Sequence, residues 1–386
     1  MLKYLSGLFF FFFFISLFNC STLSVKKGHL KQDLTQYGEL FIVTLNSPLN
    51  ATNLSYIRQI QPAGFLLSKK SFTSSEDLLK TVKTLYTLNT NITPWIMIDQ
   101  EGGSVDRLKD ILGQLPSQRV RANKLTPTKE NKLLSTYLSA VSLLGINMNL
   151  APVSDIYLFS HSFIKNRCFS SNINKTSEFT KTDYEAYKTM GITPVLKHFP
   201  NHGAVKIDSH FQLPLFNHSR VSAYTQDLLP YIKTKPKAIM LSHLLWTNVD
   251  PVYPCSSSQK VIDYCKKTVP SIELIITDDI NMGAITRNFN ITNYTIQALN
   301  SGINLVLTTD KIKNILDLYK KVIQKADQKN IKTTIQANLK LKKEMKLKEK
   351  RDVFLKSLIT KKNLIVQIQK QIKDYNLLLK NFFPNN

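Results

Sequence analysis

The stretch WIMIDQE, residues 95–101, decides the fold class of this chain of 386 residues. Four apolar residues, the length of a short buried strand, are followed at once by Asp99 and Glu101. Seven more runs of this kind begin at Leu40, Gly64, Ile146, Ile192, Ala238, Leu274 and Ile303. Helix-like segments such as 74–88 and 131–145 separate them. Eight strands alternating with helices predict a (β/α)₈ barrel, with an open doubly wound sheet as the alternative.

Polar side chains gather at one end of these runs. They are Asp99 and Glu101, Asp155, Lys197 and His198, Ser242 and His243, and Asp278 and Asp279. In a barrel the carboxyl ends of the strands converge at one face, where active sites are built. A random scatter would place as many polar residues at the starts of the runs. The asymmetry therefore predicts an enzyme.

The segment KHFPNHGAVKIDSH, residues 197–210, holds three of the seven histidines of the chain. His198 and His202 have metal-ligand spacing, but Pro200 interrupts any helix there and no HExxH motif is present. We therefore predict no metal and no cofactor. Asp208 and His210, two apart on an extended segment, would share one face, so that the carboxylate orients an acid/base imidazole. A loop histidine that caps a turn is the alternative.

Asp278 and Asp279 end the run LIITDD. Neighbouring residues on a strand point to opposite faces, so only one of the two is expected to face the barrel mouth. A carboxylate held there can attack an acetal carbon and form a covalent intermediate. The alternative is that both acids cap the following helix, a role that suits Asp279 in particular.

The first residues, MLKYLSGLFFFFFFISLFNC, have the pattern of an export signal: a charged start and a short apolar run. The run is too short to span a bilayer as a helix. The ending LFNC resembles a bacterial lipoprotein signal, which implies cleavage after residue 19 and lipidation of Cys20. We expect an exported lipoprotein that is anchored to the membrane. An ordinary cleaved signal or a retained anchor is the alternative.

The net charge of +24 is concentrated in residues 311–386, which hold 20 Lys and Arg against 6 Asp and Glu. Without glycine, and with Pro384 as its only proline, this segment is predicted to be helical. It is either a solvated face or a surface that lies on membrane or cell wall. Nucleic acid is not an expected partner of an exported protein. Three further cysteines form no disulfide framework, although Cys255 and Cys265 could form a bridge.

Four motifs carry a family resemblance: IDQEGGSVDRL, NRCFS, KHFPNHGAVKIDSH followed by FQLP, and TDDINMGA. In order and spacing, residues 37–309 resemble the bacterial β-N-acetylglucosaminidase branch of family 3 glycoside hydrolases. The resemblance implies Asp278 as nucleophile and His210 as acid/base, assisted by Asp208. It implies that the sugar hydroxyls are bound by Asp99, Arg107, Arg167, Lys197 and His198.

By resemblance, the expected activity is that of an exo-acting, retaining β-N-acetylglucosaminidase. It would release terminal N-acetylglucosamine from peptidoglycan fragments or chitin-derived oligosaccharides. The alternatives are a non-catalytic sugar-binding surface lipoprotein and a phosphorylase that transfers the sugar to phosphate. The expected organisation is a signal peptide (1–19), a linker (20–36), a barrel (37–310) and a basic helical segment (311–386). A monomer is expected.

Overall fold

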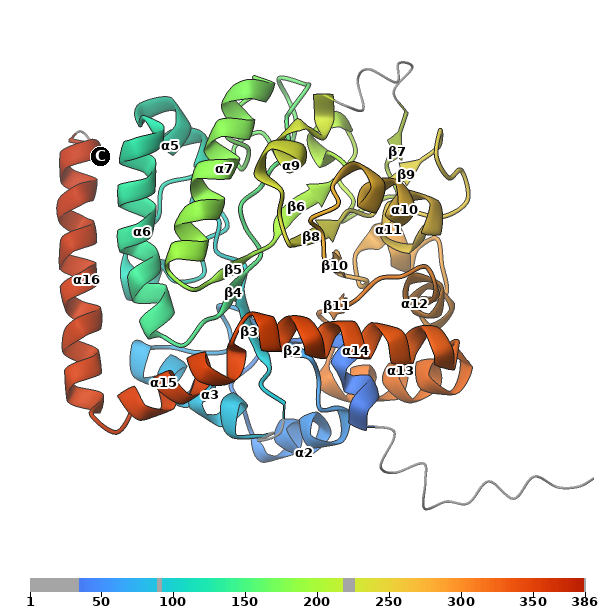
Figure 1. Ribbon diagram of the computed structural model, residues 1–386, viewed down its shortest axis with the longest axis horizontal. Helices are drawn as coiled ribbons and strands as arrows, with labels where there is room; N and C mark the ends of the chain where they lie inside the picture. Colours follow the sequence, from blue (N-terminus) through green and yellow to red (C-terminus); the bar gives the residue numbers. More distant parts are fainter. Residues whose placement is uncertain (1–34, 89–91, 218–225, 385–386) are drawn as a thin grey trace, which may run out of the picture.

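The structure is a computed structural model that describes residues 35–88, 92–217 and 226–384 (Figure 1). The predicted signal peptide and the predicted lipidation residue Cys20 lie outside the described residues. Within the described ranges, no helix has both the length and the apolar character needed to span a membrane. The first described element is the 3-10 helix η1 (Thr35–Leu40), which leads directly into the first strand.

Each of the eight apolar runs contains at least one strand, and all of these strands pair in parallel. They are β1 (Phe41–Leu45), β2 (Gly64–Leu67), β3 (Trp95–Ile98), β4 (Met148–Asn149), β5 (Thr193–Pro194), β6 (Leu196–Phe199), β8 (Ala238–Leu241), β10 (Leu274–Thr277) and β11 (Val306–Thr308). One sheet has the order β11-β1-β2-β3-β4-β5, and the other has the order β10-β8-β6. The run at Ile192 contributes two strands, because β5 pairs with β4 while β6 pairs with β8.

The two sheets meet at both of their ends. Only Val195 separates β5 from β6 along the chain. On the other side, the amide of Thr277 donates to the carbonyl oxygen of Leu305 at 3.0 Å, and Ile276 and Leu305 form a parallel bridge. A separate two-stranded ladder, β7 (Leu215–Phe216) with β9 (Leu245–Trp246), lies in the loops after β6 and β8. The fold is mixed α/β with parallel sheets.

Helices alternate with these strands and surround them (Figure 1). The α-helices are α2 (Ala51–Ile60), α3 (Ser75–Leu88), α4 (Lys109–Leu112), α5 (Gln118–Lys124), α6 (Pro127–Leu143), α7 (Ile173–Thr189), α9 (Leu229–Thr234), α10 (Gln259–Thr268), α11 (Gly283–Thr286), α12 (Ile291–Asn300), α13 (Ile312–Lys325), α14 (Gln328–Glu344), α15 (Leu347–Ser357) and α16 (Lys361–Phe382). Two short 3-10 helices are η2 (His202–Ala204) and η3 (Cys255–Ser257).

Local sequence signals set the helix ends. The Ser74 hydroxyl accepts from the amide of Asp77 at 3.1 Å and so caps α3. The helix expected from residue 131 begins earlier, at Pro127, because Thr126 caps it and proline is favoured at the first position. Gly145, at φ +82°, ends this segment.

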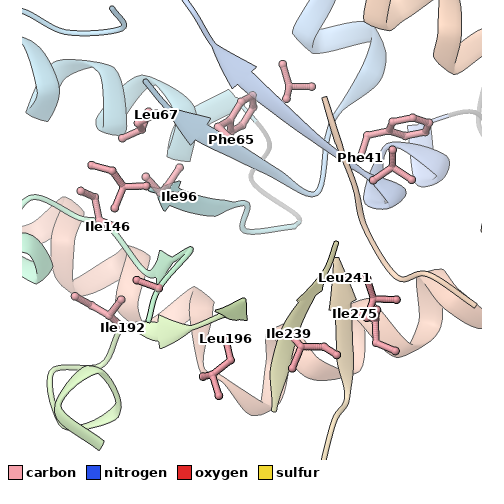
Figure 2. Close-up of a cluster of buried hydrophobic side chains, with 14 of the residues drawn as sticks. Phe41, Phe65, Leu67, Ile96, Ile146, Ile192, Leu196, Ile239, Leu241 and Ile275 are labelled. Carbon is pink, nitrogen blue, oxygen red and sulfur yellow. The ribbon is translucent and has the colours of Figure 1, made fainter. Parts of the chain in front are cut away.

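Side chains alternate between two apolar layers along each strand. Ile42, Leu66, Trp95 and Met97 lie in an inner cluster with residues of the facing strands. Phe41, Phe65, Leu67 and Ile96 lie in the outer cluster between the strands and the helices, where Figure 2 shows several of them. Because both faces of the strands are buried, the runs are continuously apolar and do not alternate with polar residues.

The C-terminal segment forms α13 to α16 and packs on the rest of the domain. Phe354 of α15 lies against Tyr86, with ring centroids 5.6 Å apart. Tyr375 of α16 lies against Tyr137 at 5.0 Å and donates its hydroxyl to the carbonyl oxygen of Gln114 at 2.7 Å. Aromatic contacts therefore hold this segment in place. Among the described residues, the three cysteines are buried free thiols, so Cys255 and Cys265 are not bridged.

Candidate active site

A cavity of about 410 Å³ opens at the carboxyl ends of the strands. The predicted site residues that line it are Asp99, Arg107, Arg167, Lys197, His198, His210 and Asp278. The first and last of them, Asp99 and Asp278, are 179 positions apart in the sequence, so only the fold brings the whole set together. The sequence-based expectation that the polar ends of the runs converge is met by this cavity.

Lys197 is the centre of a buried charge cluster at the base of the cavity. It is 2% exposed, and its Nζ lies 2.5 Å from Oδ1 of Asp99 and 2.6 Å from Oε1 of Glu101. Glu101 also accepts two bonds from Arg167, at 2.8 and 2.7 Å. Burial alone would raise the pKa of Glu101, but Arg167 and Lys197 hold it well below its usual range. Arg107 lies 3.8 Å from Asp99 at the outer side.

This charge cluster holds the hydrogen-bond donors of Arg167 and Lys197 in fixed positions. A bidentate Arg167–Glu101 pair gives the guanidinium one orientation, and two carboxylates keep the Lys197 ammonium charged inside the protein. Burial acts to lower the pKa of Lys197, but Asp99 and Glu101 reverse the shift, so the net change is upward. The cavity therefore presents rigid cationic donors, of the kind that bind hydroxyl groups or anions.

Asp155 links His198 to the segment that leads toward His210. The Nδ1–H of His198 donates to Oδ2 of Asp155 at 2.6 Å, and the amide of His202 donates to Oδ1 at 2.5 Å. The Nε2 of His202 lies 2.6 Å from the hydroxyl of Ser209. One buried carboxylate thus fixes the tautomer of a cavity histidine and also the start of the loop that carries His210.

His210 and Asp208 do form a pair, although not in the expected extended geometry. The Nδ1–H of His210 donates to Oδ1 of Asp208 at 2.8 Å, and the His210 amide donates to the same oxygen at 2.9 Å. The amide of Phe211 donates to the carbonyl oxygen of Asp208 at 3.0 Å, so the segment is a turn. A turn brings residues i and i+2 together through the side chain of Asp208. The other ring nitrogen, Nε2, is left without a recorded partner among the described residues.

The loop of His210 is fastened to the segment after Asp278. The amides of Gly283 and Ala284 donate to the carbonyl oxygens of His210 and Ser209, each at 3.0 Å. A Cβ on Gly283 would lie 2.5 Å from the carbonyl oxygen of His210, so only glycine allows this approach. The imidazole itself is 61% exposed and stands at the rim of the cavity.

Both Asp278 and Asp279 line the cavity, whereas only one was expected to. The chain leaves β10 at Thr277, so the strand alternation no longer applies to them. Asp279 accepts from the hydroxyl of Thr309 at 2.5 Å and from the Asn281 amide at 3.1 Å, and burial raises its pKa to about 6. It joins two loops and does not cap α11 with its side chain.

Asp278 is held in the ionised form. Burial would raise its pKa, but the imidazoles of His198 and His243, the amide of Asp279 and the charge of Lys197 hold it at about 2. The amide of Asp279 donates to its Oδ1 at 2.8 Å. An anionic carboxylate at the base of a cavity with cationic donors is suited to attack on an electrophilic carbon.

Four residues with clear contacts to this site had no role in the sequence-based assignment: Glu101, Asp155, His202 and His243. His243 is fully buried, donates its Nε2–H to the carbonyl oxygen of Asp279 at 2.9 Å and lies 2.6 Å from the Ser256 hydroxyl. Glu101, Asp155 and His243 stand among the polar residues at the ends of apolar runs, but that pattern gave none of them an individual role.

Among the residues that the structure describes, no group of three or more His, Cys, Asp and Glu side chains could hold a metal ion. The nearest approach to such a group is Asp155 with His198 and His202, whose contacts are hydrogen bonds and a ring contact with centroids 5.7 Å apart. The imidazole of His202 instead contacts Ser209.

A family model and named relatives agree on the class of protein that this chain resembles. The family model described as "Glycosyl hydrolase family 3 N terminal domain" matches residues 29–340. A protein of Psychromonas ingrahamii named beta-hexosaminidase is 30% identical over 256 residues, which cover 64% of this chain and 74% of the relative. A beta-hexosaminidase of Nitrosomonas eutropha is 25% identical over 279 residues, covering 70% of this chain and 80% of that one.

Solved structures share the fold. A family 3 beta-N-acetylglucosaminidase from Paenibacillus sp. str. FPU-7 superposes with a TM-score of 0.75 at 22% identity. The match covers 83% of this chain and 63% of that chain, which is therefore considerably longer. The beta-N-acetylglucosaminidase from Thermotoga maritima gives a TM-score of 0.69 at 24% identity, covering 79% of this chain and 66% of that one.

Proposed function

Because the chain belongs to glycosyl hydrolase family 3, and is thus a glycoside hydrolase, we propose that it is an exo-acting, retaining β-N-acetylglucosaminidase. The names of its relatives support the β-N-acetylhexosaminidase class. The observation that carries the proposal is the placement of Asp278 and His210 on one cavity. Asp278 is anionic at the base, and His210 stands exposed at the rim, where its Nε2 contacts no other group in the part of the chain that the structure describes.

The proposed reaction has two steps. In the first, a carboxylate oxygen of Asp278 forms a bond to the anomeric carbon while the bond from that carbon to the leaving oxygen breaks. Protonated Nε2 of His210 gives its proton to the leaving oxygen. In the second, neutral Nε2 takes a proton from water, the water oxygen bonds to the anomeric carbon, and the glycosyl ester to Asp278 breaks. Asp208 holds Nδ1–H throughout and so keeps Nε2 directed at the substrate.

Asp99, Arg107, Arg167, Lys197 and His198 are proposed to bind the hydroxyl groups of the terminal sugar. Their cluster with Glu101 forms the base of the cavity, and we propose that the terminal sugar ring binds against this base. This geometry supports release of single residues from the non-reducing end. The proposed substrates are peptidoglycan fragments or chitin-derived oligosaccharides that end in N-acetylglucosamine.

Two structural expectations belong with this proposal. The neighbour order of the strands follows the chain order, in contrast to the reversal found in doubly wound sheets, and this supports closure into one barrel. We also propose residues 37–310 as the hydrolase domain, and lipidation at Cys20 as the anchor of an exported protein.

The decisive experiment compares wild type, Asp278→Asn and Asp227→Asn on an aryl β-N-acetylglucosaminide. The isosteric Asp278→Asn change should lower kcat by about 10³-fold or more while melting temperature is kept. Asp227 is a buried carboxylate that accepts from the side-chain amide of Asn201 and does not line the cavity, so it serves as the control. Appreciable turnover by Asp278→Asn would refute the nucleophile assignment.

Two further measurements define the reaction. On an N-acetylglucosamine oligomer, stepwise release of monosaccharide is expected, and mid-length fragments would show an open cleft instead. The same reaction with added phosphate should give no sugar 1-phosphate. Formation of that product would identify a phosphorylase.

A further inference from the structure

The amino ends of the strands, opposite the cavity, are covered by α14 and α15 (Figure 1). The side-chain amide of Asn338 donates to the carbonyl oxygens of Glu39 and Asn304, at 2.8 and 3.0 Å, and these two residues stand just before β1 and β11. Phe354 of α15 fits against Gly145, just before β4. The two helices therefore form the side of the fold that faces away from the active site.

We call the exposed side of α14 and α15 the floor face. Its exposed lysines are Lys329, Lys332, Lys340, Lys343, Lys346, Lys348 and Lys356. The acids with exposed side chains in the same segment, residues 328–358, are Glu344, Glu349 and Asp352, and Asp352 is paired with Arg351. Of the exposed lysines, within the described residues, Lys340 alone has a recorded ion pair, 3.7 Å from Glu344. The floor face thus carries a positive charge that the protein leaves largely uncompensated.

Other side chains of α14 and α15 hold the two helices on the strands. Lys342 is buried and pairs with Glu39 at 2.6 Å, while Leu341 and Leu347 join the inner apolar cluster of the strands. The exposed lysines make no comparable contact. Lys329, Lys332, Lys340 and Lys343 are separated by three, eight and three residues on α14, and these spacings place them along one side of the helix.

A cavity of about 350 Å³ lies beside the floor face, between α15 and the segments before β4 and β5. Tyr86, Ile146 and Phe354 give it apolar walls, and three charged residues, Lys346, Glu349 and Lys350, also line it. Lys350 is half-buried, its pKa is lowered by burial, and no ion pair is recorded for it among the described residues. The two lysines outnumber Glu349, so the cavity carries a net positive charge that favours an anionic ligand. The apolar walls favour a ligand with hydrocarbon next to the charge.

The chain also enters the described structure at this face. The hydroxyl of Tyr37, in η1, donates to the Gln328 side chain at 2.5 Å, so η1 packs on the start of α14. The 34 residues before η1 include the apolar run from Leu8 to Phe18. The part of the chain that carries this run therefore joins the described structure beside the start of α14.

From these observations we propose that the floor face binds an anionic phospholipid bilayer, with a headgroup phosphate seated at Lys346 and Lys350. Exposed lysines near an anionic bilayer each add about 1 kcal/mol of attraction, which falls off within a Debye length of about 10 Å. In this orientation the active-site cavity opens away from the membrane. The proposal does not depend on the proposed reaction, because binding and turnover use opposite ends of the strands.

The test is co-sedimentation of the full chain with two kinds of vesicle. One is phosphatidylcholine, and the other contains about one third phosphatidylglycerol. The readout is the ratio of the two partition coefficients, because the apolar N-terminal run contributes to both. We expect a high ratio for wild type and about a 100-fold lower one for the triple variant Lys329→Glu, Lys332→Glu, Lys343→Glu. Salt at about 0.5 M should abolish the difference.

The matched control changes three exposed lysines elsewhere, Lys132→Glu, Lys181→Glu and Lys260→Glu, and alters net charge equally. Its ratio should stay close to wild type. An equal fall in both triple variants would reduce the effect to net charge and overturn the proposal. Equal binding of wild type to both kinds of vesicle would also overturn the proposal. If the protein then bound a soluble polyanion such as heparin, the floor face would be assigned to an acidic polymer.

A separate substitution tests the proposed headgroup-binding site at Lys346 and Lys350. Lys350→Met keeps the apolar stem and removes the charge, and it should lower the ratio about fivefold. Lys350→Arg should restore it. Turnover of the aryl substrate in both variants should remain at the wild-type level, which separates this proposal from the reaction. An unchanged ratio of partition coefficients for Lys350→Met would refute the proposed headgroup-binding site.

Discussion

Replacement of Glu101 by glutamine tests whether the buried charge cluster builds the site. The Glu101 side chain is 1% exposed and accepts two bonds from Arg167 and one from Lys197. Glutamine has nearly the same shape, but its amide group turns an N–H toward a cation and removes the negative charge. Breaking a buried ion pair by changing one partner costs about 3–5 kcal/mol. Lys197 keeps Asp99, so the lower end, about 3 kcal/mol, is expected.

Urea unfolding followed by tryptophan fluorescence measures this loss. With a slope of about 3 kcal/mol per M, the midpoint should fall by about 1 M with an unchanged slope. Because Arg167 and Lys197 also lose their fixed positions, kcat/KM on the aryl substrate should fall about 10- to 100-fold.

Two comparisons make the result interpretable. Glu185→Gln breaks an exposed pair with Lys188 at 3.0 Å and should cost less than about 0.5 kcal/mol. Adding Arg167→Met to Glu101→Gln should cost less stability than the sum of the single changes. A loss of under about 1 kcal/mol in Glu101→Gln, together with unchanged kcat/KM, would refute the argument that this cluster is what holds the site.

Three further outcomes are expected. His210→Ala should lower kcat/KM about 10²- to 10⁴-fold for poor leaving groups and little for good ones, measured across aryl glycosides; an equal loss for all would remove His210 as the proton donor. Burial, chiefly, lowers the pKa of His202 to about 4, so its stabilising effect is present above pH 6.5 and lost as the pH falls toward 4. The free energy of unfolding of wild type minus that of His202→Asn should therefore drop by about 3 kcal/mol from pH 7 to pH 4, and a flat difference would contradict this. Asp99→Ala should raise KM and lower kcat together in steady-state kinetics, because bonds to sugar hydroxyls strengthen toward the transition state, whereas a change in KM alone would indicate uniform binding.

The sequence predicted the strands more completely than the helix ends and the pairing between strands. All eight apolar runs form strands because each is buried on both faces, and that condition leaves a continuous apolar signal. Helix ends were less certain: α6 begins four residues before the expected position, since the Thr126–Pro127 start precedes the apolar pattern. The split of the run at Ile192 into β5 and β6 depends on which strand each half faces, and no local pattern records that.

For the site, the pattern of polar run ends determined that Asp99, Lys197 and Asp278 meet at one cavity, because chemistry placed at the end of a strand stays there in any parallel fold. The family resemblance, and not that pattern, implied that Arg107, Arg167 and His210 belong to the same site. The sequence by itself did not determine how they are arranged. Glu101 binds Arg167 and Lys197, and Asp155 binds His198 and His202, across gaps of 43 to 96 residues. Pairs that far apart meet only after the strands align, and burial then decides which groups keep their charge. The tertiary structure therefore set the partners and protonation states, since both depend on distance and solvent access.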